Sequence, residues 1–216
     1  LRINRASDDA AGLGIANALT QQINTADQGI RNLNDGISIV QTAEGALSQV
    51  SEMAQRILSL TVQATSGSLS STQHASVYAE MKTLITGITN VQTRTKFSGT
   101  TLFASTAINV FNGKESTDKI EITAAALATI GSAAGSALTL SSLINTAGTE
   151  TGSTYYQSIA TSASLYITAL DTQRGLLGAI QNQMEYSVSN ITELSANLTS
   201  ARSRIIDTDY ASETAN

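Results

Sequence analysis

The sequence predicts a mainly α-helical protein with a small β-containing insert: an elongated antiparallel helical bundle, or coiled-coil rod, plus a small variable outer domain. Three observations support this fold class. Apolar residues recur every three or four positions over long stretches near both ends of the chain. The 216 residues include no Pro, which breaks helices. Between the two helical stretches the pattern changes to short alternating segments bounded by turn residues.

The clearest apolar stripe runs from Ile30 to Ala64. Its members follow steps of three or four and form one face of a helix; they are Ile30, Leu33, Ile37, Val40, Ala43, Leu47, Val50, Met53, Ile57, Leu60 and Ala64. At about 1.5 Å per residue this stripe is a rod of roughly 50 Å. We expect the helix to begin near Leu19, after a looser entry, because Gly12 and Gly14 each weaken helix.

A second, shorter helix is expected after a Ser/Thr-rich link around Gly67. Ser71 or Thr72 is the predicted cap, and the helix runs from about Gln73 to Thr95. Its stripe is Val77, Met81, Leu84 or Ile85, Ile88 and Val91. A short link between two long helices predicts that they pack as antiparallel neighbours.

Two hairpin signals follow from about Lys96. Ser98-Gly99 lies between apolar and aromatic residues, and Asn112-Gly113 follows the apolar segment 108–111. The segment 120–123 alternates and is the expected return strand. Residues 124–151 are low in charge, and a short helix at 125–130 and a short strand at 138–140 are expected there.

The helical period returns at about Ser153 and persists to about Ile205. The stripe is Ile159, Ala163, Leu170, Leu177, Ile180, Met184, Val188, Ile191, Leu194, Leu198, Ala201 and Ile205. We therefore divide the chain into residues 1–96 and 152–205, which form the helical rod domain, residues 97–151, which form the insert, and a polar tail at 206–216. Both termini are expected at one end of the bundle.

The composition argues against several functions. Net charge is −5 and the pI is about 4.8, so there is no electrostatic case for nucleic acid or an anionic membrane surface. No apolar run approaches the length of a membrane span. The sequence has no Cys and one His, His74, which is expected at the surface. Adjacent Asp8 and Asp9 do not face each other on a helix and are expected to cap one. Glu115 and Asp118 are too few ligands for a calcium loop. We therefore expect no catalytic site, no cofactor and no metal, and hence no enzyme.

Five segments resemble bacterial flagellin, in the family's order: LRINRASDDAAGLGIANAL, NDGISIVQTAEGAL, AQRILSLTVQATSG, TKFSGTTLF and ANLTSARSRIIDTDYASETAN. They lie on both flanks of the insert. The resemblance implies a structural subunit of the bacterial flagellar filament, secreted to the cell surface, that self-assembles into a helical homopolymer for motility. It also implies that the terminal helices which drive polymerisation in the family lie outside this sequence. Two positions, Ser59 and Ile206, depart from residues common in the family.

The resemblance further implies partners. A flagellar export chaperone and the filament cap are expected to bind the family's members, and the innate immune receptor Toll-like receptor 5 reads a surface patch that maps here onto Arg56, Leu60, Gln63 and Glu80. The first three lie at i, i+4 and i+7 on one helix face. The alternative is that Leu60 belongs to the buried stripe and that Arg56 makes only subunit contacts.

Two other functions remain open from the sequence. One is a cell-surface flagellin homologue that acts as an adhesin or binds a cell-surface polysaccharide through its exposed Ser, Thr, Asn and Tyr residues. The other is a hook–filament junction protein, which shares terminal motifs with flagellin. The intact AQRILSLTVQATSG segment favours flagellin itself.

Overall fold

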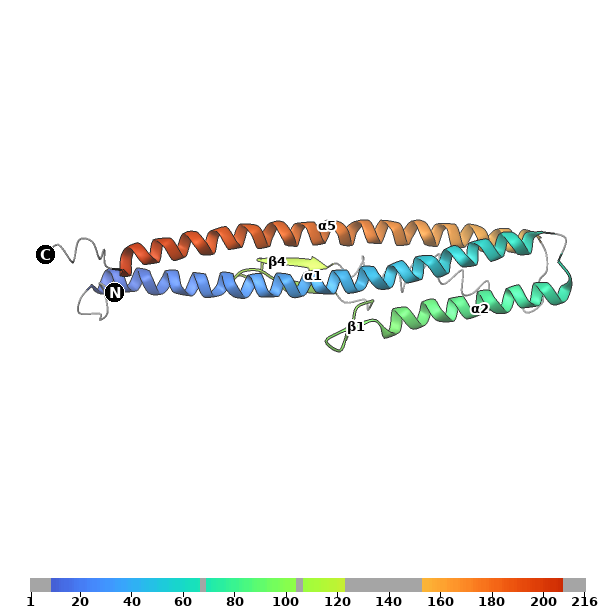
Figure 1. Ribbon diagram of the computed structural model, residues 1–216, viewed down its shortest axis with the longest axis horizontal. Helices are drawn as coiled ribbons and strands as arrows, with labels where there is room; N and C mark the ends of the chain where they lie inside the picture. Colours follow the sequence, from blue (N-terminus) through green and yellow to red (C-terminus); the bar gives the residue numbers. More distant parts are fainter. Residues whose placement is uncertain (1–8, 67–68, 104–106, 123–152, 208–216) are drawn as a thin grey trace. The chain divides into compact units, whose positions relative to one another are not determined.

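The computed structural model describes residues 9–66, 69–103, 107–122 and 153–207 (Figure 1). Three helices account for most of these residues: α1 (Ala10–Thr65), α2 (Ser71–Arg94) and α5 (Ser153–Ile206). Four short strands form two separate two-stranded sheets, β1 (Lys96–Phe97) with β2 (Thr100–Thr101) and β3 (Ile108–Phe111) with β4 (Lys119–Ile122). The prediction of a mainly α-helical chain with a small β-containing part is confirmed.

The chain divides into two compact units. Unit 1 comprises residues 1–37, 109–120 and 182–216, and unit 2 comprises residues 38–108 and 121–181. Each unit therefore contains part of α1 and part of α5. The sequence-based division at 97–151 stays a prediction, because most of that segment lies outside the described residues. The helix expected at 125–130 and the strand expected at 138–140 also lie outside them.

Helix α1 begins nine residues earlier than we predicted. Asp9 caps it, since its Oδ1 accepts a hydrogen bond from the amide of Gly12 at 2.9 Å. Ala16 is fully buried, so the first turns already pack on a neighbour. The expectation of a loose entry before Leu19 was wrong for residues 10–18, because capping and packing outweigh the helix-weakening effect of Gly12 and Gly14.

In unit 1 the start of α1 packs antiparallel to the end of α5. Arg202 donates a hydrogen bond to Thr20 at 3.4 Å, and Ser195 donates one to Asp27 at 3.1 Å. The contacts pair Thr20 with Arg202 and Asp27 with Ser195, so residue numbers rise along α1 while they fall along α5. The two helices are therefore antiparallel in this unit. The apolar core of this unit includes Ala16, Ile23, Ala26, Leu33, Val110, Met184 and Ile191. Leu194 is 49% exposed, so its expected burial was wrong. In this unit the buried Ile191 lies on the α5 face that packs against α1, and Leu194 lies at the edge of that face.

Strand β3 and the loop after it lie directly on α1 in unit 1. An added Cβ at Gly36 would come within 2.9 Å of the Val110 side chain, and one at Gly29 within 2.5 Å of the carbonyl oxygen of Asn112. These glycines are seven residues apart and so share one helix face. Between them, the Asn32 side-chain amide donates to the carbonyl oxygen of Phe111 at 2.9 Å. Because Gly29 and Gly36 have no side chain, strand β3 and the loop after it can approach the backbone of α1.

In unit 2 the second half of α1 has two helical neighbours, and its buried face is wider. Its buried residues are Val40, Ala43, Ala46, Leu47, Val50, Ser51, Ala54, Ile57, Leu60, Thr61 and Ala64. Most of the predicted stripe from Ile30 to Ala64 is confirmed; Ile30, Ile37 and Met53 are only half-buried. Helix α2 packs antiparallel to α1, because the Thr61 hydroxyl contacts the Met81 sulfur at 3.6 Å while Gly87 lies against Met53.

Helix α5 presents a regular seam to the rest of unit 2. Its buried residues are spaced alternately by three and four: Tyr156, Ile159, Ala163, Tyr166, Leu170, Gln173 and Leu177. This is the heptad spacing of a coiled coil. We did not predict Tyr156, Tyr166 or Gln173 as core residues, although the heptad spacing includes them. The phenol of Tyr166 accepts a hydrogen bond from Gln92 of α2 at 3.1 Å, and Oε1 of Gln173 is buried without a hydrogen-bond partner among the described residues.

The turns of the chain follow their sequence signals with small shifts. Ser98 and Gly99 both have positive φ, +48° and +85°, as the tight β1–β2 hairpin requires. The cap of α2 is Ser70, not Ser71 or Thr72 as expected. The Ser70 side chain accepts from the Gln73 amide and the Gln73 side chain accepts from the Ser70 amide, which is a capping box.

Candidate functional site

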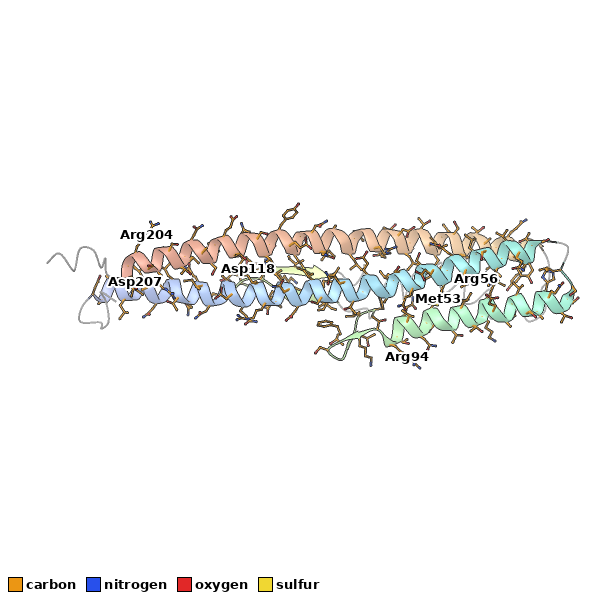
Figure 2. All side chains as sticks on the ribbon, in the orientation of Figure 1. Met53, Arg56, Arg94, Asp118, Arg204 and Asp207 are labelled. Carbon is orange, nitrogen blue, oxygen red and sulfur yellow. The ribbon has the colours of Figure 1, made fainter. Side chains whose placement is uncertain are left out.

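Two charged residues predicted to share a surface patch meet in unit 2. Arg56 of α1 and Glu80 of α2 form an ion pair, in which Nη2 of Arg56 lies 2.7 Å from Oε1 of Glu80 and Nε donates to the same oxygen at 2.9 Å. The two side chains are 55% and 44% exposed. Arg56 projects from the side of α1 that faces α2 (Figure 2). The ion pair therefore bridges two helices at the surface of one unit.

Helix packing beneath the pair sets its geometry. An added Cβ at Gly87 would come within 2.9 Å of the Met53 sulfur, so the missing side chain lets α2 approach α1 closely. One helical turn from Met53 (Figure 2), Arg56 reaches Glu80 across the helix–helix contact. The Ser59 hydroxyl donates a hydrogen bond to the backbone carbonyl oxygen of Arg56 at 2.8 Å, and therefore does not compete with Glu80 for the Arg56 side chain.

The other two residues of the predicted patch separate. Leu60 is 1% exposed and packs in the core of unit 2, whereas Gln63 is exposed on α1. The side chain of Leu60 is therefore not available to a partner at the surface. The exposed patch consists of Arg56, Gln63 and Glu80, which we call the Arg56 patch.

The electrostatics of the Arg56 patch are those of a surface. Exposed ion pairs contribute only about 0–1 kcal/mol to stability, because water and salt screen them. A second cross-helix pair in unit 2 joins Arg174 of α5 to Glu44 of α1, with 3.7 Å between Nη2 and Oε1 and side chains 37% and 41% exposed. These pairs are thus better suited to contacts with another molecule than to holding the unit together.

His74 was expected at the surface and instead is half-buried. Its ring stacks on Tyr156 of α5, with 5.5 Å between ring centres, and its Nδ1 is buried with no hydrogen-bond partner in the part of the chain that the structure describes. Burial, and then the nearby Tyr78, raise the pKa of the Tyr156 phenol. The sequence signal that could have predicted the burial of His74 is the aromatic pair Tyr155-Tyr156 at the start of α5. In this unit the starts of α5 and α2 run parallel and lie side by side.

Three acidic residues of the described part of the chain have local structural roles, whereas Asp8, the other predicted cap, lies outside the described residues. Asp9 caps α1, and Asp207 accepts a hydrogen bond from the Ser203 hydroxyl at 2.8 Å. In the loop after β3, the Asp118 carboxylate accepts the Glu115 amide at 2.9 Å. Among the described residues, no group of three His, Asp or Glu side chains is placed to hold a metal ion.

A shallow groove of about 330 Å³ lies within unit 1, between α1, α5 and the loop that follows β3. Its lining includes Ala26, Ile191 and Leu194, and Lys114 is its one charged lining residue. The groove is thus aliphatic rather than polar. No helix among the described residues has the length and hydropathy needed to cross a membrane.

Comparisons with known proteins identify the family. The model for the bacterial flagellin N-terminal helical region matches residues 1–107, and the model for the bacterial flagellin C-terminal helical region matches residues 161–216. The flagellin of Halalkalibacterium halodurans is 35% identical over 215 residues, which are 99% of this chain and 76% of that protein. The flagellin of Bacillus subtilis is 34% identical, covering 99% of this chain and 78% of that protein.

A third relative and a solved structure agree. The flagellar filament 33 kDa core protein of Treponema phagedenis is 31% identical over 99% of this chain and 77% of its own length. The crystal structure of Bacillus cereus flagellin shares the fold, with a TM-score of 0.60, 21% identity, and coverage of 80% of this chain and 94% of that one. Family models at both flanks and relatives along nearly the whole chain lead to one conclusion: this chain belongs to the bacterial flagellin family.

Proposed function

We propose that the Arg56 patch serves this flagellin twice, as a contact between subunits and as the surface read by Toll-like receptor 5. As a flagellin, the chain is a structural subunit of the bacterial flagellar filament, the cell-surface appendage that drives motility. The observation that supports the proposal is the exposed Arg56–Glu80 ion pair, which presents both charges on adjacent helices of one unit.

The filament role is tested in the bacterium that produces the chain. Deletion of its gene is expected to remove the filaments and abolish swimming, and the restored gene is expected to return both. Electron microscopy with a labelled antibody then locates the protein. Label spread over the cell surface without filaments would instead favour the adhesin or polysaccharide-binding alternative.

In this proposal the receptor recognises the exposed charges of Arg56 and Glu80, which contribute little to the stability of the fold. We predict that Arg56→Ala combined with Glu80→Ala abolishes activation of Toll-like receptor 5 by the monomer, as measured in a reporter cell line. Because the pair is exposed, the free energy of unfolding of the double variant is expected to lie within about 1 kcal/mol of that of the parent. Leu60 would support recognition only indirectly, by holding α1 in place from the core.

A matched control is available in the same unit. Arg174→Ala combined with Glu44→Ala removes another exposed cross-helix ion pair and changes the charge equally. This control is expected to signal like the parent. Full signalling by the Arg56/Glu80 variant, or equal loss in the control, would rule the receptor proposal out.

Export through the flagellar secretion apparatus, with help from a chaperone and capping of the growing filament, follows from family membership as a proposal. A chain without Cys forms no disulfide that would hinder passage through a narrow channel as an unfolded polypeptide. In cells that lack the flagellar export machinery, the protein is expected to stay inside. Its appearance in the medium of such cells would contradict this route.

A further inference from the structure

Helix α5 carries a second regular seam in unit 2, and its two leucines are exposed. Leu165 and Leu176 are 57% and 46% exposed. They lie eleven residues apart, which is three helical turns and about 20°, so they share one face. Together with the exposed Thr172 and the half-buried Ser162 and Ala169 they repeat the alternating three- and four-residue steps of the buried seam, shifted back by one position. The Thr172 hydroxyl is already bonded to the carbonyl oxygen of Thr168.

This spacing indicates a helical partner. A heptad seam is the pattern that packs against another helix, as the buried seam of the same helix does within unit 2. None of the five positions of the second seam is charged, although a helix surface exposed to water usually carries charges. Large exposed leucines separated by small residues present knobs that need a surface of small side chains opposite them.

The outer face of α2 in the same unit offers such a surface. It is opposite the buried residues Val77, Met81 and Ile88, and its exposed positions also step by three and four: Ala79, Thr83, Thr86, Asn90 and Thr93. None of these residues is charged. The hydroxyls of Thr83, Thr86 and Thr93 donate to backbone carbonyl oxygens one turn earlier. Covering them therefore leaves no hydroxyl hydrogen without an acceptor.

The exposed residues of the α5 seam (Leu165, Thr172 and Leu176) and the outer face of α2 lie in one unit of one chain, so they do not cover each other there. We propose that the Leu165–Leu176 seam of one copy packs on the outer face of α2 of a second copy. This inference rests on the filament assembly given above and deepens it. The contact joins two different surfaces. A contact of this kind builds an open helical polymer when the rotation from copy to copy does not close into a ring, and a filament is such a polymer.

The absence of Cys from the chain allows a direct test. Two alleles, one with Leu176→Cys and one with Thr86→Cys, are expressed together in the producing bacterium, and intact filaments are treated with a short thiol cross-linker. The proposed contact holds the two thiols together, so the mixed filaments are expected to yield at least about tenfold more covalent dimer than filaments of either single variant. Ala79→Cys and Asn90→Cys replace Thr86→Cys in parallel, which covers shifts in register along α2.

The matched control is Ser164→Cys, which is also exposed on α5 in unit 2 but lies on a different face from Leu176. Paired with Thr86→Cys it is expected to give only background dimer. Filaments that form normally but cross-link no better than this control overturn the inference. So does a cross-link within single dissociated chains that carry Leu176→Cys together with an α2 Cys, because the occupant would then be the same chain. Failure of the unsubstituted protein to form filaments would instead refute the filament role itself.

A second measurement does not depend on cross-linking. Leu165→Lys combined with Leu176→Lys is expected to shorten filaments severely while thermal unfolding of the monomer stays like that of the parent, because both side chains are exposed in the monomer. Gln157→Lys combined with Ser164→Lys adds the same charge on another exposed face and is expected to leave filament length unchanged. Normal filaments from the leucine variant would overturn the inference.

Discussion

Glycines in α1 have opposite roles that their sequence context does not reveal. Among the described residues, no neighbouring atom lies within 4 Å of the place where a Cβ on Gly14 would be, whereas a Cβ at Gly29 would meet the backbone of Asn112. In the first case the residue only weakens the helix, and in the second it makes room for the loop after β3. The sequence identified Gly12 and Gly14 as helix-weakening residues but gave no reason to single out Gly29, because its partner is about 80 residues away.

Alanine at these two positions is expected to have effects of opposite sign. Gly14→Ala should raise the free energy of unfolding by about 0.5–1 kcal/mol, since alanine has the better helix propensity. Gly29→Ala should lower it by about 1–3 kcal/mol, because backbone atoms of the loop must shift. Urea unfolding followed by circular dichroism measures both. Equal stabilisation by the two substitutions would show that the loop after β3 does not lie on α1.

Tyr166 links the stability of the fold to alkaline pH. Its phenol is 1% exposed, and burial raises its pKa well above 10, against a smaller lowering by the Gln92 hydrogen bond. Above the ordinary tyrosine pKa of about 10 the unfolded chain loses this proton while the folded chain keeps it. The stabilising contribution is thus complete below about pH 10 and is lost as pH rises toward the folded-state pKa.

The expected slope is about 1.4 kcal/mol of lost stability per pH unit from this residue in the range above pH 10. Tyr166→Phe should reduce the steepness of the alkaline loss by that amount, even though it also removes the hydrogen bond to Gln92. Tyr186→Phe is the control, because Tyr186 is 78% exposed. Unfolding free energies measured as a function of pH test this, and parallel slopes for Tyr166→Phe and the parent would contradict it.

At the scale of elements, the ends of the described helices were predicted to within two residues, except for the start of α1. The segment Ser70-Ser71-Thr72-Gln73 contains the capping-box pattern, in which Ser and Gln are three residues apart. We placed the cap one or two residues too late because several hydroxyl residues compete in this link. Helix α5, in contrast, begins at the predicted residue and ends one residue later than predicted.

The capping box gives a measurable difference between two neighbouring serines. Ser70→Ala is expected to lower stability by about 1 kcal/mol, since an unpaired amide is left at the start of α2. Ser71→Ala lies inside the first turn and should change stability by less than about 0.5 kcal/mol. Thermal unfolding of the two variants distinguishes them. A larger loss in the Ser71 variant would place the cap where the sequence first suggested.

The candidate site shows where reasoning on single elements stops. Positions 56, 60 and 63 lie along one helix, and the sequence favoured both a surface patch and a buried stripe for Leu60. The structure buries Leu60 in the core of unit 2, leaves Arg56 exposed where it reaches Glu80 of α2, and leaves Gln63 exposed. The choice depended on where a second helix lies, which the spacing within α1 does not contain.

For the molecule as a whole, the absence of Pro removes one cause of slow folding. The slow phases of many refolding reactions come from isomerisation of X–Pro bonds, which takes tens to hundreds of seconds. This chain has no such bond. Refolding from urea is therefore expected to lack a slow phase that depends on the time spent unfolded, as measured by double-jump stopped-flow experiments. Acceleration of any phase by a prolyl isomerase would contradict this prediction.

The sequence by itself determined the helical periods at both ends, the two hairpins, the low charge and the resemblance to flagellin, because periodicity, turn chemistry and family motifs are properties of consecutive residues. Only the tertiary structure decided that Leu60 is buried beside an exposed Arg56–Glu80 pair, that Gly29 and Gly36 receive β3 and its loop, and that one of two equally regular seams of α5 is covered in unit 2. Each of these depends on which distant segment packs against a helix face. A helix with two regular seams does not specify which of them the same chain will bury, since both satisfy the same local spacing.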